Sequence, residues 1–202
     1  MAVKIQNVEH QIDTREKIAC AATHLFAVHG YDATSIRDIA EESGVTKPVV
    51  YYYFQSKENL FATLIHEAYS FFFQALEKLF EEETDFWDRW KKVTHLYFDL
   101  SMEYRDTVQL IYIYSFGPRG KSPRINMLEI EKIHTQYLSR LFREGIQQGF
   151  VRNIENIEWI TNLYLGVIVM YQQQLLFTDA PVPENYADII MEMVYNGIGG
   201  VK

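Results

Sequence analysis

The stretch "TSIRDIAEESGVTKPVVYYYF", residues 34–54, decides the fold expected for the first part of this chain. A helix-turn-helix needs a small residue where its two helices touch, a glycine in the tight turn and apolar residues on the inner face of the second helix. The series Ile36, Ala40, Gly44, Val45 and Val50 meets these requirements together, at the right spacing. The stretch therefore predicts two short helices joined by a turn at Gly44.

Four consecutive aromatic residues, Tyr51 to Phe54, end this stretch. On the second helix Val50, Tyr53 and Phe54 share one face, so we expect Tyr53 and Phe54 to anchor the helix in the domain core. Tyr51 and Tyr52 are then left for solvent or for DNA. A tyrosine hydroxyl bonds phosphate oxygens well, and its ring packs against a thymine methyl group.

Helical periodicity continues on both sides of this unit, and no alternation typical of strands persists. The sequence predicts an all-α protein with an N-terminal three-helix helix-turn-helix domain and a C-terminal helical ligand-binding and dimerisation bundle. The segment 163–171 is apolar nearly all round, which suggests a dimer interface through the last two helices. Outside residues 34–54, helices are expected at about 13–30, 56–79, 85–104, 106–116, 124–148, 156–177 and 184–196.

The charge of the chain restricts how it can meet nucleic acid. The 202 residues carry a net charge of -8, and residues 1–60 contain six basic against eight acidic side chains. Attraction to phosphate depends on the field at the contact surface rather than on the total charge. Any DNA interface must therefore depend on a few well-placed basic and polar groups.

No targeting or membrane signal is visible in the sequence. The N-terminus lacks a basic start followed by an apolar run, and the longest apolar stretch, Leu163 to Tyr171, has nine residues. A helix that spans a bilayer needs about 20 apolar residues. We expect a cytoplasmic protein with no membrane partner.

Catalytic and metal-binding patterns are missing from the sequence. The six histidines are scattered, and no GxSxG, P-loop or GxGxxG motif occurs. Cys20 is the single cysteine, which excludes an intrachain disulfide or a cysteine metal cluster. The chain is expected to be no enzyme and to use no cofactor and no metal.

The opening stretch and its flanks resemble the TetR family of bacterial transcriptional regulators over about residues 13–61. Pro48 stands where the family pattern usually has a glycine, at a spot where a proline is tolerated but removes a donor. The residues that carry the resemblance are Thr34, Ile39, Ala40, Ser43, Gly44, Val45, Thr46, Lys47, Tyr51, Tyr53, Phe54, Ser56, Lys57 and Leu60.

The resemblance, together with the helix positions, implies a DNA-binding domain at 1–56 and an effector-binding and dimerisation domain at 57–202. Helix N-termini suit phosphate, and Pro48 and Val49 suit apolar contact with bases. The expected partners are a double-stranded DNA operator, a small-molecule effector and a second copy of the chain. The expected DNA-binding residues are Thr34, Ser35, Thr46, Lys47, Pro48, Val49, Tyr51, Tyr52 and Lys57.

Aromatic residues crowd the C-terminal half, and most of them are expected in the core. The resemblance implies an effector pocket between the middle helices, suited to an apolar or aromatic molecule or a cation, with Asp99 or Glu103 as a counter-charge. The candidate lining residues are Phe72, Tyr97, Tyr112, Tyr137 and Tyr164.

Two functions stay open from the sequence. The first is a sequence-specific regulator, a repressor released from a palindromic operator by a small apolar or aromatic effector. The alternative is a DNA-bound protein of the same fold that recruits a protein partner and has no effector, for which the acidic run 81–85 offers a surface. A cavity in the C-terminal bundle distinguishes the two.

Overall fold

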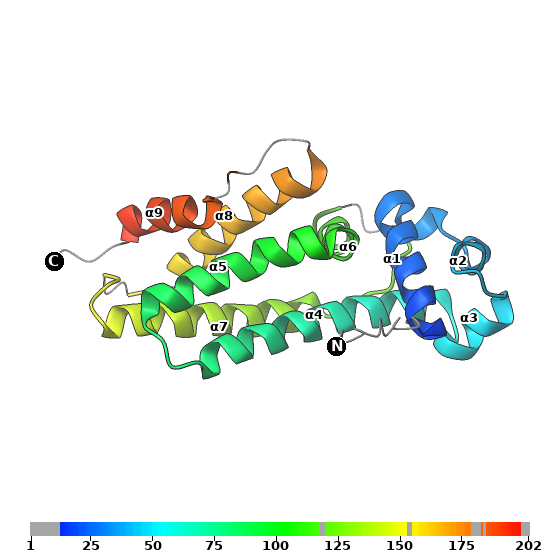
Figure 1. Cartoon of the computed structure of the whole chain (residues 1–202), viewed down its shortest axis with the longest axis horizontal. Coiled ribbons are helices and arrows are strands. Elements are labelled where there is room, and N and C mark those ends of the chain that lie inside the picture. Colours follow the sequence, from blue (N-terminus) through cyan, green and yellow to red (C-terminus); the bar gives the residue numbers. More distant parts are fainter. Residues whose placement is uncertain (1–12, 118–119, 153–154, 179–182, 184, 199–202) are drawn as a thin grey trace, which may run out of the picture.

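The computed structural model describes residues 13–117, 120–152, 155–178, 183 and 185–198, which form nine α-helices and no β-strand within those ranges (Figure 1). The expected all-α fold is confirmed. The molecule is elongated, with the first three helices at one end and the C-terminal helix near the other. The helices are α1 (Thr14–Ala33), α2 (Ile36–Glu42), α3 (Lys47–Phe54), α4 (Lys57–Glu81), α5 (Phe86–Glu103), α6 (Arg105–Phe116), α7 (Met127–Gln147), α8 (Ile157–Phe177) and α9 (Tyr186–Ile198).

Local sequence signals explain how the N-terminal helices begin and end. Gly30 has φ 79° inside α1, a conformation that glycine adopts without steric cost, and it redirects the chain. Gly44 has φ 68° in the turn between α2 and α3. The N-cap of α2 is Ser35, whose hydroxyl accepts from the Asp38 amide while the Asp38 carboxylate accepts from the Ser35 amide. The capping box therefore fixes the start of the first helix of the helix-turn-helix.

One core holds these helices together and takes in parts of the next ones. Buried side chains of α1, α2 and α3 pack with the first turns of α4, and Leu110 of α6 joins the same cluster. The rings of Phe26, Tyr31 and Phe61 lie with centroids 5.0 to 5.6 Å apart. The expected domain boundary after residue 56 lies at the start of α4, and it stays a prediction.

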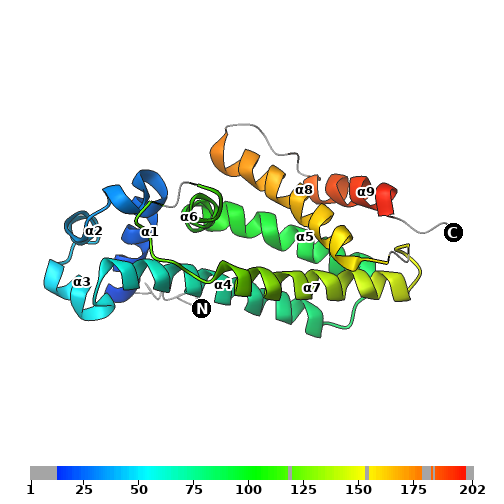
Figure 2. The ribbon, with the colours of Figure 1, turned by 180° about the vertical axis from the view of Figure 1, so that it is seen from behind.

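A second core fills the C-terminal bundle. Figure 2 shows α4 and α7 side by side along the long axis, with α8 and α9 on one side of the molecule. Trp90 and Tyr164 are fully buried at its centre, within reach of Phe142 at ring separations of 5.5 to 6.1 Å. α4 contributes buried residues to both cores, so it connects the N-terminal helices to the C-terminal bundle.

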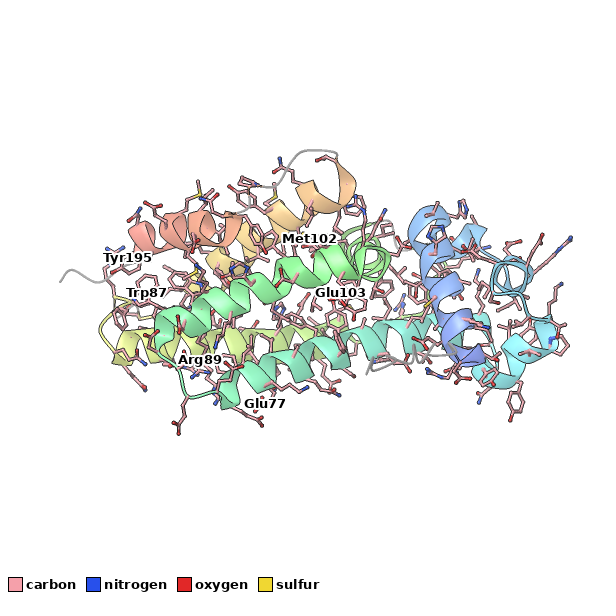
Figure 3. All side chains as sticks on the ribbon, in the orientation of Figure 1. Glu77, Trp87, Arg89, Met102, Glu103 and Tyr195 are labelled. Carbon is pink, nitrogen blue, oxygen red and sulfur yellow. The ribbon has the colours of Figure 1, made fainter. Side chains whose placement is uncertain are left out.

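Arg89 secures the turn between α4 and α5 (Figure 3). Its side chain is only 8% exposed, and its Nε lies 3.0 Å from the Glu144 carboxylate of α7. The remaining guanidinium nitrogens donate to the carbonyls of Leu79, Glu82 and Thr84. All three guanidinium nitrogens of this buried cation are hydrogen-bonded. Removing one member of such a buried charged pair strongly destabilises the fold.

We predict that Arg89→Ala lowers the free energy of unfolding by about 3 kcal/mol, because Glu144 and three carbonyls lose their donor. Denaturant titration followed by circular dichroism measures this change. Lys92→Ala is the control, since it breaks an exposed pair with Glu82 at the same turn and is expected to cost less than about 1 kcal/mol. Equal losses in both variants would contradict the role assigned to Arg89.

Among the described residues, no helix combines the length and the apolar character needed to cross a bilayer.

Candidate functional site

The second helix of the helix-turn-helix, α3, buries one side and exposes the other. Val50 is fully buried and Phe54 is 2% exposed, which anchors the helix in the N-terminal core. Tyr51 is 48% and Tyr52 81% exposed, and Lys47 is exposed at the N-terminal end. Lys47, Tyr51 and Tyr52 therefore present a cation and two phenols on the free side of α3.

Tyr53 differs from the sequence prediction, which placed it in the core. Its side chain is 36% exposed, and its ring packs edge-on against Tyr52 with centroids 5.2 Å apart. The buried spacing on α3 is the four-residue step from Val50 to Phe54, because a helix of 8 residues has room for only one narrow apolar stripe. Tyr53 lies at the edge of that stripe and adds a third exposed phenol to the surface.

The other predicted residues of α3 and its cap lie at the start of the helix. Thr46 is the N-cap and is exposed, with no hydrogen bond from its side chain to the cap. Pro48 is exposed in the first turn, where its missing amide is not needed. Val49 is partly buried and packs on the N-terminal core. Pro48 has no amide hydrogen and the Val49 amide donates to the Thr46 carbonyl, so the Lys47 amide and the Thr46 hydroxyl are the neutral donors suited to phosphate at this N-terminus.

Thr34 and Lys57 have structural bonds that the sequence did not reveal. The buried Thr34 hydroxyl donates to the carbonyl oxygens of Gly30 and Leu25, 2.9 and 3.1 Å away, so Ser35 rather than Thr34 caps α2. The Lys57 ammonium donates to the carbonyls of Tyr31 and Thr34 at 2.6 and 2.7 Å, and burial lowers its pKa. Both side chains bind the carbonyls that end α1 instead of facing outward, while Ser35 stays exposed.

We predict that Tyr51→Ala and Lys47→Ala each weaken operator binding about tenfold or more, because each removes an exposed side chain of α3 that we expect to contact a phosphate or a base. Mobility-shift titrations at fixed moderate salt measure the change, and circular dichroism checks the fold. Lys78→Ala serves as the control, since it removes the same charge from the far end of α4. Unaltered DNA affinity in both α3 variants would contradict this interface.

A cavity of about 740 Å³ opens between the two ends of the molecule. Its wall is apolar and aromatic for the most part, with residues from α4, α5, α6, α7 and α8. Ala19, Cys20 and Thr23 of α1 complete the wall. The cavity therefore touches the N-terminal domain directly, and any molecule bound in it contacts α1 and the bundle at once.

Three of the five aromatic residues proposed as lining residues lie on this wall, namely Phe72, Tyr97 and Tyr112. Tyr137 and Tyr164 lie elsewhere. The Tyr137 hydroxyl donates to Glu77 at 2.5 Å, and Tyr164 is fully buried with its hydroxyl 2.8 Å from that of Thr94. Helical periodicity predicts that these rings face the interior. Whether such a ring lies in the packed core or on the cavity wall depends on the tertiary structure.

Of the two acidic residues expected to provide a counter-charge, only one lines the cavity. Glu103 lines the cavity at the end of α5 next to α6 (Figure 3). Asp99 instead accepts from the Tyr186 hydroxyl of α9 at 3.3 Å. The sequence reasoning missed the whole α1 part of the cavity wall and most of the α6 part, which begins at Arg105.

A polar network lies on the α5, α6 and α8 side of the cavity. The Gln172 amide nitrogen donates to the Tyr97 carbonyl and the Ser101 hydroxyl at 2.8 and 2.7 Å, and its oxygen accepts from Tyr112 at 2.8 Å. The His134 ring is hydrogen-bonded to the Tyr97 hydroxyl, and burial lowers the pKa of the imidazole to about 4. His134 is therefore neutral at pH 7 and available as a polar contact for a bound molecule.

Acid is predicted to destabilise the fold through His134. Its pKa is about 4 in the folded chain and about 6.5 when unfolded, so only the unfolded state takes up this proton between those values. The contribution of this group to stability is full above about pH 6.5 and falls as the pH drops towards 4, by roughly 3 kcal/mol. Denaturant titrations from pH 7.5 to 4.5 test this. His134→Gln should flatten the profile relative to the parent, and parallel profiles would be evidence against it.

Comparison with known proteins gives one family. A sequence model described as "Bacterial regulatory proteins, tetR family" matches residues 18–64, which contain the helix-turn-helix. The HTH-type transcriptional regulator QacR of Staphylococcus aureus is 29% identical over 75% of this chain and 76% of its own length. The HTH-type transcriptional regulator YfiR of Bacillus subtilis is 26% identical over 90% of this chain and 87% of its own.

Solved structures share the whole fold. The TetR family transcriptional regulator PfmR from Thermus thermophilus superposes with a TM-score of 0.73 at 23% identity, covering 92% of this chain and 98% of that one. At this identity the likeness concerns the fold alone. The sequence matches and the shared architecture nevertheless agree, and the related proteins are regulators rather than enzymes.

Proposed function

This chain belongs to the TetR family of DNA-binding transcriptional regulators, and from that premise we propose that it is a repressor released from its operator by a small molecule. The observation that carries the proposal is the cavity wall, which runs from α8 through the bundle to Ala19, Cys20 and Thr23 of α1. A bound effector would touch the DNA-binding domain without an intermediary. This cavity favours an effector over the alternative of partner recruitment alone.

The proposed DNA contacts lie on and around α3. The Lys47 ammonium and the hydroxyls of Tyr51 and Tyr52 would bind phosphates, and the Thr46 end of α3 would meet another. Pro48 and Val49 would touch thymine methyl groups in the major groove. Ser35 would contribute from the start of α2, whereas Thr34 and Lys57 would act indirectly by holding the end of α1.

The proposed assembly is a homodimer through α8 and α9. Large apolar side chains stay exposed on these helices, and monomeric proteins rarely expose such groups together. They are Trp159 at 71%, Leu163 at 51%, Met170 at 65% and Met193 at 59% exposed. A two-fold dimer would present two α3 helices about one DNA turn apart, ~34 Å, which suits a palindromic operator.

The proposed effector is an apolar or aromatic molecule held by Phe72, Tyr97 and Tyr112, with His134 and Gln172 as polar contacts. A volume of about 740 Å³ is in the range of small-molecule sites. The effector would bind more tightly to the arrangement in which the two α3 helices are misplaced for DNA. DNA affinity would then fall by the ratio of its affinities for the two arrangements.

The test begins with a mobility shift on the DNA directly upstream of the coding region of this chain. A library of apolar and aromatic compounds is then screened for those that raise the melting temperature and release the DNA. We predict that Val169→Trp, which fills the cavity from α8, keeps the shift and loses both responses. Leu128→Trp adds the same ring at an exposed α7 position and should behave like the parent.

Two results would contradict the proposed effector site or the proposed repressor function. If Val169→Trp still responds to the effector, the site lies outside this cavity. If the purified protein shifts neither this DNA nor DNA selected from random sequences, the repressor proposal is wrong.

A further inference from the structure

The charged groups of the cavity wall are strongly unbalanced. Among the described residues that line it, Arg105 is the single Arg or Lys. Its guanidinium already donates to the carbonyls of Leu175 and Leu176 at the end of α8, 3.1 and 2.7 Å away. His134 is neutral at pH 7 because burial lowers its pKa. The wall also carries four carboxylates, one each from α4, α5, α6 and α7, those of Glu67, Glu103, Asp106 and Glu131.

Two of these carboxylates also hold the first helix of the DNA-binding domain. Glu67 of α4 forms an ion pair with Arg15 of α1. Asp106 of α6 accepts from the His24 ring of α1 at 2.7 Å, and this contact raises the pKa of the imidazole. Arg15 and His24 of α1 therefore use the same carboxylates that face the cavity.

The Arg15 contact extends to the recognition helix. Its guanidinium carbon lies 5.2 Å from the ring centroid of Phe54, the residue that anchors the C-terminal end of α3. One cation thus touches both the cavity carboxylate Glu67 and α3. A change in the charge balance at Glu67 would be felt at α3 through this single side chain.

Aromatic rings supply the rest of a cation site. Phe71 and Tyr104 lie edge-to-face at 5.6 Å, and Phe72 and Tyr97 lie 5.2 Å apart, all four on the cavity wall. A cation over such ring faces is attracted by the ring quadrupole. Rings together with carboxylates select a bulky organic cation over a neutral or anionic molecule of the same shape.

We propose that the cavity binds an aromatic or apolar organic cation, and that this cation competes with Arg15 and His24 of α1 for Glu67 and Asp106. Loss of these two ion pairs lets α1 shift against the bundle within its apolar contact with α6, and α3 shifts with α1. The proposal rests on the proposed effector site and names both its ligand class and its coupling.

The strength of the ion pairs suits such competition. All four side chains are between 40% and 51% exposed, so each pair stabilises the contact only modestly, and a ligand that also buries apolar surface can displace it. Coupling is reciprocal, so removing a competing cation of α1 must tighten ligand binding. This sign separates competition from a merely structural role for the pairs.

The experiment uses tetraphenylphosphonium and tetraphenylborate, which share one shape and carry opposite charge, on the full-length protein by isothermal titration calorimetry. The phosphonium is expected to bind at least about tenfold more tightly than the borate. Glu67→Gln and Asp106→Asn should each weaken phosphonium binding about two- to fivefold, and Arg15→Met should strengthen it by a similar factor. Glu81→Gln, at the end of α4 outside the cavity, should change nothing.

Equal or reversed affinities for the two ions overturn the cation inference, as does the absence of phosphonium binding. An Arg15→Met variant that binds phosphonium more weakly, or no differently, overturns the competition. These failures are distinct from failure of the repressor proposal. A neutral compound that binds the cavity and releases DNA keeps that proposal while the cation inference falls. If phosphonium binds with the predicted variant effects but the protein shifts no DNA, the cation inference stands and the repressor proposal is wrong.

Discussion

The contact between α1 and α6 is the constraint on which the arrangement of the molecule depends. Leu110 of α6 is 3% exposed in the N-terminal core, and the Tyr114 ring lies 5.4 Å from Phe61 of α4. Since burial of apolar surface is the main favourable term in folding, separating the two ends of the molecule would be costly. The helix-turn-helix is therefore mounted on the bundle as one packed unit.

Weaker polar contacts surround this apolar contact and influence the position of α1. Two exposed ion pairs lie along α1, and the backbone amide of Lys121, after α6, donates to the Asp32 carboxylate at 3.1 Å. Each contributes little, so together they bias the position of α1 without fixing it. The cavity wall includes the carboxylates of both ion pairs and Ile111, which packs on the N-terminal core.

Several features could be read from the sequence because they depend on local chemistry. The spacing from Ala40 through Gly44 to Val50 required a helix-turn-helix, and Phe54 was correctly placed in the core. Tyr53 was placed in the core but is exposed, and the carbonyl partners of Thr34 and Lys57 were not foreseen. The exposure of Tyr53 depends on the angle at which α3 meets the core. Lys57 binds carbonyls at the end of α1, an element distant in sequence.

The sequence by itself determined the all-helical class, the position of the DNA-binding unit and the exposed face of its second helix, because helical period and turn chemistry act within a few residues. Only the tertiary structure decided which inward-facing rings line a cavity and which are packed solid, as Tyr112 and Tyr164 show. It also decided which carboxylates meet α1, since Glu67 and Asp106 reach Arg15 and His24 across separations of 52 and 82 residues. Such pairings depend on how whole helices pack, and no local pattern encodes them.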